Sequence, residues 1–301
     1  MGTWHAVNAL VVVLLGVTAV CDAAAAYRPV VFMHGLGDSS AHLEGLVTGL
    51  QRRYPGMYAW AVPVCNGRSS MTTTMSDQVQ AFTRAVQENH RLTNGFNLVG
   101  LSQGALVARA YVEMYNVPRV HRLISVVGPQ EGVDGCPKTV PRFLCDLFEA
   151  DPYDAPVAIS GYWKDVNNKD EYLAKSPFLA DINNERPTKN AQYADNMRSL
   201  DMYVLVQAAN DTVVTPRASE HHGFWAWNNA RTVVPMRQSP GYRGDWIGLK
   251  SLDRQGKIAF LQFQGDHVDV VRVGFWDDRI VPLLDDPIPV VQEDGRFSSM
   301  E

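Results

Sequence analysis

Short apolar runs alternate with amphipathic helical patterns along most of this 301-residue chain. The apolar runs lie at residues 29–33, 57–64, 96–100, 123–127, 202–209 and 257–263. The amphipathic patterns between and after them lie at 43–50, 75–86, 106–114 and 273–283. Strands that alternate with helices form a mostly parallel sheet with helices on both faces. The sequence therefore predicts an α/β fold.

Residues 130–200 lack a strand pattern and are rich in aromatic side chains. An insertion of this kind, at the carboxyl edge of a parallel sheet, is where a lid or substrate-binding subdomain lies. We predict a single domain over 27–284, a helical or irregular lid at about 130–200, and a polar acidic tail at 285–301. The polar stretch 69–76 is typical of a solvated loop with a helix cap.

The first 26 residues differ from the rest of the chain. Residues 6–20 are almost wholly apolar, and the small residues Ala23 to Ala26 follow them. This pattern predicts a signal peptide that is removed before Tyr27. A membrane anchor is the alternative, but the run is short for a span of ~20 residues. No other stretch is long and apolar enough to cross a bilayer.

The charge and the cysteines exclude several classes of function. The net charge of −5 gives no basic surface for nucleic acid or an anionic membrane. After signal removal, Cys65, Cys136 and Cys145 remain, and no Cys-x-x-Cys motif indicates a structural zinc site. In an oxidising compartment Cys136 and Cys145 could close a small loop and leave Cys65 unpaired. We predict no metal and no cofactor, and a glycan at Asn210, which begins the sequon Asn-Asp-Thr.

Residues 97–106 read NLVGLSQGAL, so Gly100 and Gly104 flank Ser102 at a spacing of two. The spacing alone is a weak signal, but an apolar run precedes this serine and an amphipathic pattern follows it. A hydrolase serine lies on a sharp strand-to-helix turn, where glycines let the two backbones approach closely. We therefore predict that Ser102 is a catalytic nucleophile.

A serine nucleophile needs a histidine base, which lies beyond the end of a later strand. Four histidines follow Ser102 in the chain. His121 precedes its strand, so it lies at the wrong end of the sheet, and His221 and His222 fall in a predicted helix. His267 follows the strand pattern that ends at residue 263, and we predict that it is the base.

The histidine in turn needs a carboxylate to orient it, and the oxyanion needs two N–H donors. Asp211 directly follows the run at 202–209 and is the predicted acid, with Asp266 as the alternative. We expect the oxyanion donors to be the backbone N–H groups of Gln103 and Leu36. The glycines around Leu36 could instead hold a dinucleotide, but the third glycine and the acidic ribose partner are missing.

With these residues in place, the chain resembles the palmitoyl-protein thioesterases of the lysosomal type. The matching stretches follow the order of that family over nearly all of the mature chain. They are VVFMHGLGDS at 30–39, VGLSQGALVARA at 99–110, LISVVGPQEGVDG at 123–135, YWKD at 162–165, SPFLADINNE at 176–185, AANDTVVTP at 208–216, HGFWAW at 222–227, GLKSLD at 248–253 and FQGDH at 263–267. This resemblance implies an α/β-hydrolase fold, a triad of Ser102, Asp211 and His267, oxyanion donors at Leu36 and Gln103, and a disulfide between Cys136 and Cys145.

The resemblance also implies the reaction and the location. It implies hydrolysis of long-chain acyl thioesters such as palmitoyl groups on protein or peptide cysteines, in the lysosome or after secretion. The GPQ stretch is similar to a branch that prefers acyl-CoA, so acyl-CoA is a second candidate substrate. A secreted lipase or carboxylesterase with the same triad is a competing hypothesis, and so is a non-catalytic binding protein of this fold.

Overall fold

The computed structural model describes residues 27–135, 152–271 and 274–287. Its centre is a six-stranded sheet in which every neighbouring pair is parallel. In spatial order the strands are β2 (Ala59–Ala61), β1 (Val30–Met33), β3 (Phe96–Leu101), β4 (Val120–Val126), β5 (Met202–Ala208) and β8 (Ile258–Phe263). The prediction of an α/β fold with a parallel sheet is confirmed, although the run at 57–64 contributes only three strand residues.

Each buried strand supplies side chains to two separate hydrophobic clusters, one on each face of the sheet. Along β5, Tyr203 and Leu205 belong to one cluster, whereas Val204 and Val206 belong to the other. This follows from the two-residue period of a strand, whose successive side chains point to opposite faces. Continuous apolar runs are therefore what a sheet covered on both faces requires.

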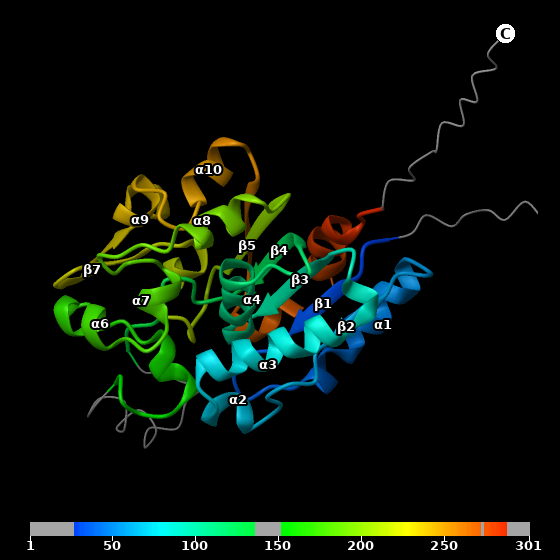
Figure 1. Ribbon diagram of the computed structural model, residues 1–301, viewed down its shortest axis with the longest axis horizontal. Coiled ribbons are helices and arrows are strands. Elements are labelled where there is room, and N and C mark those ends of the chain that lie inside the picture. The colour runs from blue at the N-terminus through cyan, green and yellow to red at the C-terminus, as the bar shows by residue number, and fades with distance from the viewer. Residues whose placement is uncertain (1–26, 136–151, 272–273, 288–301) are drawn as a thin grey trace, which may run out of the picture.

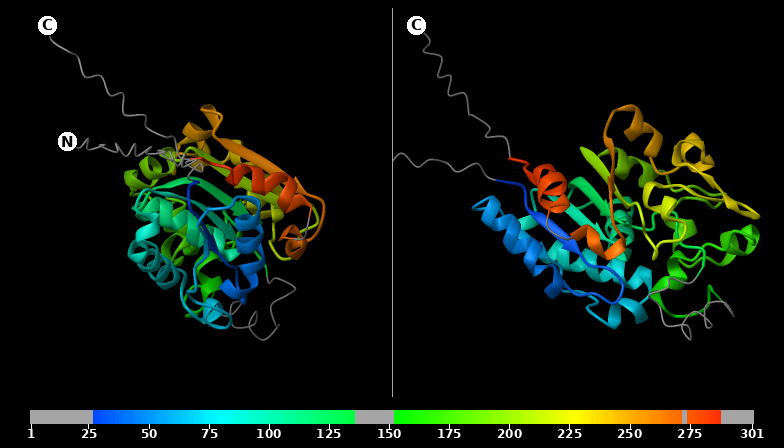
Figure 2. Two further views of the ribbon diagram at one scale, coloured as in Figure 1. Left: turned by 90° about the vertical axis from the view of Figure 1, so that its right-hand side faces the viewer. Right: turned by 180° about the vertical axis from the view of Figure 1, so that it is seen from behind.

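Helices cover both faces of the sheet (Figures 1 and 2). One face packs against α1 (Glu44–Arg53) and the last turns of the described chain, the π-helical η7 (Trp276–Ile280) and the 3-10 helix η8 (Val281–Leu284). The other face packs against α3 (Met75–Glu88), α4 (Gln103–Met114) and α8 (Ala191–Arg198). In Figure 2, left, these two groups of helices lie on opposite sides of the strands.

The remaining elements are short. They are η1 (Ser40–Leu43), α2 (Ser69–Thr72), η2 (His90–Leu92), η3 (Ala158–Tyr162), α6 (Lys169–Lys175), α7 (Leu179–Ile182), η4 (Arg217–His221), β6 (Phe224–Ala226), β7 (Asn229–Val234), η5 (Met236–Gln238), α9 (Pro240–Arg243), α10 (Leu249–Arg254) and η6 (His267–Val271). In the described part of the chain, none of the helices combines the length and the hydropathy of a membrane span.

The described parts of the insertion between β4 and β5 form helices and turns, with no strand. In Figure 1 they lie toward the end of the sheet at which the strand arrows point. Many of their aromatic rings are buried in the hydrophobic cluster shared with α3 and α4, among them Tyr153, Tyr162, Tyr172 and Phe178. These rings join the insertion to the main core. The predicted signal peptide, Cys136 and Cys145 lie outside the described residues.

Three expectations for local structure were wrong. Residues 69–76 are not a simple loop, because α2 forms there. The side chain of Gln78 donates to Ser70 O (2.9 Å) and Thr73 O (2.8 Å), and so gives a partner to backbone carbonyls in the last turn of α2. The predicted helix cap is present, since Thr74 Oγ1 accepts from Asp77 N (3.2 Å) at the start of α3.

The predicted helix around His221 and His222 also ends early. His222 has a φ of +57°, and this left-handed residue terminates the 3-10 turn η4. The next residues form β6, which pairs with β7 in an antiparallel hairpin. The last predicted helix, at 273–283, is broken into η7 and η8, because Pro282 lacks the N–H that a continuous α-helix needs there.

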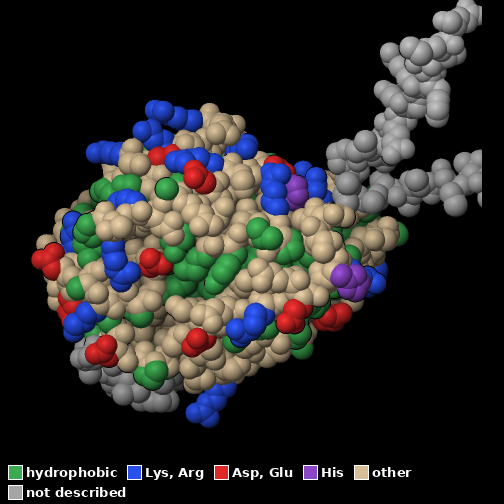
Figure 3. Space-filling model, in the orientation of Figure 1, with side chains coloured by type: hydrophobic (Ala, Val, Ile, Leu, Met, Phe, Trp, Pro, Cys, Tyr) green, Lys and Arg blue, Asp and Glu red, His purple; other side chains and the backbone are tan. Residues whose placement is uncertain are grey.

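Charged side chains of both signs are interspersed around the face of the molecule in Figure 3. Hydrophobic side chains gather in a strip across the middle of the same face. Interspersed charges give no single-signed field on this face, in keeping with the small net charge of the sequence.

Candidate active site

Ser102 lies in the turn between the end of β3 and the start of α4. Its φ of +53° and ψ of −125° are rarely adopted by residues other than glycine, and such strain is typical of a nucleophile elbow. A Cβ at Gly100 would lie 2.4 Å from Ala105 Cα, and one at Gly104 would lie 2.3 Å from His34 O. Both flanking positions therefore require glycine.

The structure brings Ser102, His267 and Asp211 together at the carboxyl end of the sheet. His267 Nε2 lies 2.9 Å from Ser102 Oγ, and His267 Nδ1 lies 2.6 Å from Asp211 Oδ2. Asp211 follows β5, and His267 begins η6 after β8. Because β5 and β8 are parallel neighbours, the two loops that follow them meet beside the serine.

The carboxylate of Asp211 is fully buried and held by several donors. Its Oδ1 accepts from the N–H groups of Val213 and Val214, both at 2.7 Å. Burial acts to raise the pKa of Asp211, but the hydrogen bond and the charge of His267 outweigh it, so the pKa is lowered. Asp211 is therefore ionised and fixed toward the imidazole.

Asp266, the alternative acid, makes different contacts. Its Oδ1 accepts from the backbone N–H groups of His267 (2.7 Å) and Thr212 (3.0 Å), and no hydrogen bond joins it to the imidazole. Asp266 therefore holds together the two loops that carry Asp211 and His267. Of the two candidate acids, Asp211 lies against the imidazole and Asp266 contacts the backbone of His267.

The other histidines that follow Ser102 lie elsewhere. His121, in β4, contacts Asp201 at 2.7 Å at the opposite end of the sheet. The ring of His221 bonds to strand carbonyls, and that of His222 contacts Glu131 and Tyr203. These three residues serve packing and hydrogen bonding within the fold.

The loop after β1, which carries Leu36, lies against the nucleophile. A Cβ at Gly35 would lie 3.0 Å from Ser102 Cβ and 3.6 Å from Ser102 Oγ. Gln103 is the first residue of α4, where backbone N–H groups have no partner within the helix and the helix dipole favours negative charge. The two predicted oxyanion donors thus belong to segments that flank Ser102.

The side chain of Gln103 holds the site together in a way that the sequence did not reveal. It is buried, and its Nε2 donates to Ser70 O (2.9 Å) and Gln78 Oε1 (3.1 Å). Its Oε1 accepts from Tyr162 Oη (3.1 Å), and Gly37 N in the β1 loop donates to Ser70 Oγ (2.7 Å). No local pattern could predict these contacts, because they join residues far apart in the chain.

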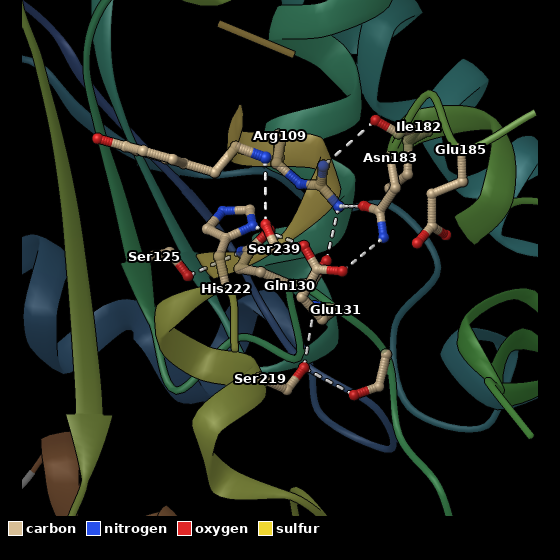
Figure 4. Close-up of polar contacts among 12 residues, drawn as sticks. Arg109, Ser125, Gln130, Glu131, Ile182, Asn183, Glu185, Ser219, His222 and Ser239 are labelled. Carbon is tan, nitrogen blue, oxygen red and sulfur yellow. Dashed lines mark hydrogen bonds and ion pairs between the residues drawn. The ribbon is translucent and has the colours of Figure 1, made fainter. Parts of the chain in front are cut away.

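A buried polar network ties α4 to the insertion (Figure 4). The Arg109 guanidinium donates to Gln130 O (2.9 Å) and Asn183 Oδ1 (2.8 Å), and it pairs with Glu113 at 3.0 Å. Asn183 Nδ2 in turn donates to Glu131 Oε2 at 3.2 Å. Buried charges are tolerated only when they are paired and hydrogen-bonded, so this network fixes the insertion in one position.

Of the remaining predicted site residues, the structure describes Asn210 and Cys65. Asn210 is exposed, and its glycan stays a prediction. Cys65 is a half-buried free thiol whose pKa is raised by burial. Cys136 and Cys145 lie outside the described residues, so their disulfide also stays a prediction.

Comparison with known proteins places this geometry in a family. The profile of the palmitoyl protein thioesterase family matches residues 29–267. Palmitoyl-protein thioesterase 3 of Dictyostelium discoideum is 38% identical over 249 residues, covering 81% of this chain and 86% of its own.

Two further relatives extend the comparison. Palmitoyl-protein thioesterase 1 of Caenorhabditis elegans is 34% identical and covers 84% of this chain and 90% of its own. Lysosomal thioesterase PPT2 of Rattus norvegicus is 33% identical, and the match covers 77% of this chain and 79% of that relative. The chain therefore belongs to the palmitoyl protein thioesterase family of thioester hydrolases.

Proposed function

We propose that this enzyme hydrolyses long-chain acyl thioesters, palmitoyl thioesters above all, through a covalent intermediate on Ser102. The observation that carries the proposal is the unbroken contact chain from Ser102 Oγ through His267 to the buried carboxylate of Asp211. Membership of the palmitoyl protein thioesterase family supports the thioester as the bond that is cleaved.

In the first half of the reaction, Ser102 Oγ attacks the thioester carbonyl while its proton passes to His267 Nε2. A new C–O bond forms, and negative charge develops on the former carbonyl oxygen. The N–H groups of Leu36 and Gln103, together with the amino end of α4, stabilise that charge. The C–S bond then breaks, and the proton on His267 passes to the departing sulfur.

In the second half, a water molecule attacks the acyl-enzyme and gives a proton to His267. The C–O bond to Ser102 breaks, the serine recovers its proton, and the free fatty acid leaves. Asp211 stays ionised throughout, and it holds the imidazole in the required tautomer. A thiol, with a pKa of about 8.5, leaves with less help from an acid than an alcohol does.

The acyl chain must supply much of the recognition, because a triad alone does not separate thioesters from esters. Enclosing each methylene contributes ~0.8 kcal/mol, so a palmitoyl chain could contribute up to ~10 kcal/mol. We propose that the insertion encloses it. A cavity of about 200 Å³ in the insertion supports this proposal, and it is lined by Val157, Gly161 and Phe178. Gly161 precedes Tyr162 in the chain, and the Tyr162 hydroxyl donates to Gln103, the residue after Ser102.

Palmitoylated cysteines of proteins or peptides are the proposed natural substrates, with long-chain acyl-CoA as the second candidate carrier. Several relatives are named lysosomal thioesterases, and the predicted signal peptide supports entry into the secretory pathway. We therefore propose the lysosome as the site of action, with secretion as the alternative.

Hydrolysis of a palmitoyl thioester and of the matched palmitoyl oxoester by the purified mature chain tests the proposal, with Ser102→Ala as the control. We expect a strong preference for the thioester and no activity in the variant. A preference for the oxoester would make the enzyme a lipase or an esterase. Activity that survives Ser102→Ala would exclude the proposed nucleophile.

A further inference from the structure

Glu220 is a fully buried acidic residue that lies beside the triad, and the proposed mechanism does not use it. It lies on η4, and its Oε2 accepts from Ala208 N at 2.8 Å, at the end of β5. Its Oε1 is buried and receives no hydrogen bond from any described residue. An ionised carboxylate with one oxygen unsatisfied in the interior would be strongly destabilising.

The neighbour of Glu220 is the catalytic acid. One oxygen of Glu220, one oxygen of Asp211 and one ring nitrogen of His267 all lie within 4.8 Å of one another. Two carboxylates this close in a buried site do not both ionise, so one of them keeps its proton. Asp211 faces the imidazole and accepts from Val213 N and Val214 N, which favour its ionised form. The proton therefore belongs to Glu220.

The acid–base properties of the two residues agree with this assignment. Burial, followed by the negative charge of Asp211, raises the pKa of Glu220 to about 10. A hydrogen bond with Glu220 is among the contacts that lower the pKa of Asp211. Glu220 is thus protonated across the pH range in which such an enzyme works.

We propose that Glu220 is a positioning residue, which keeps its proton and donates it through Oε1–H to Asp211. Asp211 then has a donor for each direction of its carboxylate: His267, the backbone of Val213 and Val214, and Glu220. Each donor makes Asp211 harder to protonate and limits its rotation. This inference rests on the proposed function, and it adds that Glu220 keeps the pair of Asp211 and His267 active at acidic pH.

The other charged groups around the pair are engaged elsewhere or lie at its edge. Asp266 binds backbone N–H groups of the two catalytic loops, and Arg217 lies at the start of η4. His221 contacts strand carbonyls, and Glu131 pairs with Lys164 and His222. Glu220, by contrast, has a carboxyl oxygen within 4.8 Å of an oxygen of Asp211.

Two substitutions separate the proposed donor from simple packing. Glu220→Gln keeps an acceptor for Ala208 N and a donor for Asp211, whereas Glu220→Met keeps the length and loses both. Ser219→Ala is the matched control, because the Ser219 hydroxyl is buried on the same helix and bonds Glu131 N and Gly132 O. The measurement is the pH dependence of kcat/KM for a palmitoyl thioester, scaled by titration of reactive Ser102 with a fluorophosphonate.

In Glu220→Met, we expect the acidic limb of the pH profile of kcat/KM to move to higher pH by about one unit. At pH values on the acidic side of the limb, this shift is a roughly tenfold loss of kcat/KM. The reason is that the Asp211 carboxylate, without this donor, attracts a proton more strongly, so a higher pH is needed to keep the catalytic pair in its active state. Glu220→Gln should keep the limb of the wild type, and Ser219→Ala should lose stability without moving it. An unmoved limb in Glu220→Met, or a limb in Glu220→Gln that moves as far, would overturn the inference.

If Glu220→Met does not fold, infrared difference spectra of the wild type and Glu220→Gln at pH 7 decide the question. The wild type should have a protonated-carboxyl band that is missing in Glu220→Gln, and a spectrum without this difference would refute the assignment. Failure of the proposed function looks different, because the wild type would then not hydrolyse the palmitoyl thioester at all.

Discussion

Ser102 combines a strained backbone with a hydroxyl that makes no helix-capping hydrogen bond. Serine at the start of a helix usually caps it, but here the hydroxyl contacts His267 instead. The strand before Ser102 and the helix after it hold the strained conformation. Side chains at positions 100 and 104 would clash with backbone atoms and force the turn open, and glycine avoids these clashes. This strained conformation is what the proposed role of Ser102 as a nucleophile requires.

At this scale, Asp211→Asn tests the orientation of the imidazole. The amide keeps the size of the side chain but favours the wrong tautomer of His267, so kcat should fall by about 10³- to 10⁴-fold. Steady-state hydrolysis of a palmitoyl thioester measures it. Asp266→Asn is the control, since Asp266 contacts only backbone and Thr212 groups in the described structure, and it should lose far less. Equal losses in both variants would contradict the assigned roles.

Gly104→Ala tests the close approach of helix and strand. Its new Cβ would lie 2.3 Å from His34 O, a backbone atom that cannot move alone, so we expect a destabilisation of about 3 kcal/mol. Gly49→Ala, in α1, meets no atom within 4 Å and should stabilise by up to ~1 kcal/mol. Urea unfolding compares the two, and a neutral Gly104→Ala would argue against the tight turn.

At the scale of elements, the insertion is joined to α4, the helix that follows Ser102, by polar contacts as well as by packing. Tyr162 in η3 contacts Gln103, and Arg109 in α4 contacts Asn183 after α7. Helix α4 therefore carries the proposed oxyanion donor at its start and an anchor for the insertion further along. This arrangement couples the chemistry at Ser102 to the segment that we propose encloses the acyl chain.

Val157→Gln places a polar side chain in the cavity of the insertion. It should lower kcat/KM for a palmitoyl thioester about tenfold more than for a butyryl thioester, because only the longer chain would reach the cavity. Val233→Gln on β7 changes an exposed valine of the same kind and is the control. Equal losses on both substrates would place the acyl chain elsewhere.

At the scale of the whole molecule, stability at acidic pH depends on buried ion pairs. Burial acts to raise the pKa of Glu131, but Lys164 and then His222 outweigh it and lower the pKa to about 2. A depressed pKa gives stability that is present above the unfolded value of about 4.3 and is lost as the pH falls toward the folded value. At about pH 5, most of this stabilisation is therefore still present.

Glu131→Gln tests this contribution. The stability difference between the wild type and the variant should be about 1.5 kcal/mol smaller at pH 3 than at pH 5, because the wild type loses most of this stabilisation over that range. Urea unfolding at both pH values measures it. Asp195→Asn, on an exposed ion pair, should give a small and nearly constant difference. A Glu131→Gln difference that does not change with pH would contradict the assigned pairing.

The sequence by itself determined the alternation of strands and helices, the position of Ser102 at the end of a strand, and which of four histidines lies beside that serine. Local periodicity and the direction of parallel strands suffice for those points, since each depends on neighbours within a few residues. The hairpin of β6 and β7 was missed because a strand of three residues is defined by its partner rather than by its own pattern.

Only the tertiary structure decided which groups meet across the sheet. Glu220 lies nine positions after Asp211 in the sequence, in a stretch that reads as a helix, and nothing local marks it as part of the site. The fold buries it, leaves one of its oxygens without a donor and places it against Asp211. Burial and proximity set the proton affinity of a carboxyl group, and both are properties of the packed chain.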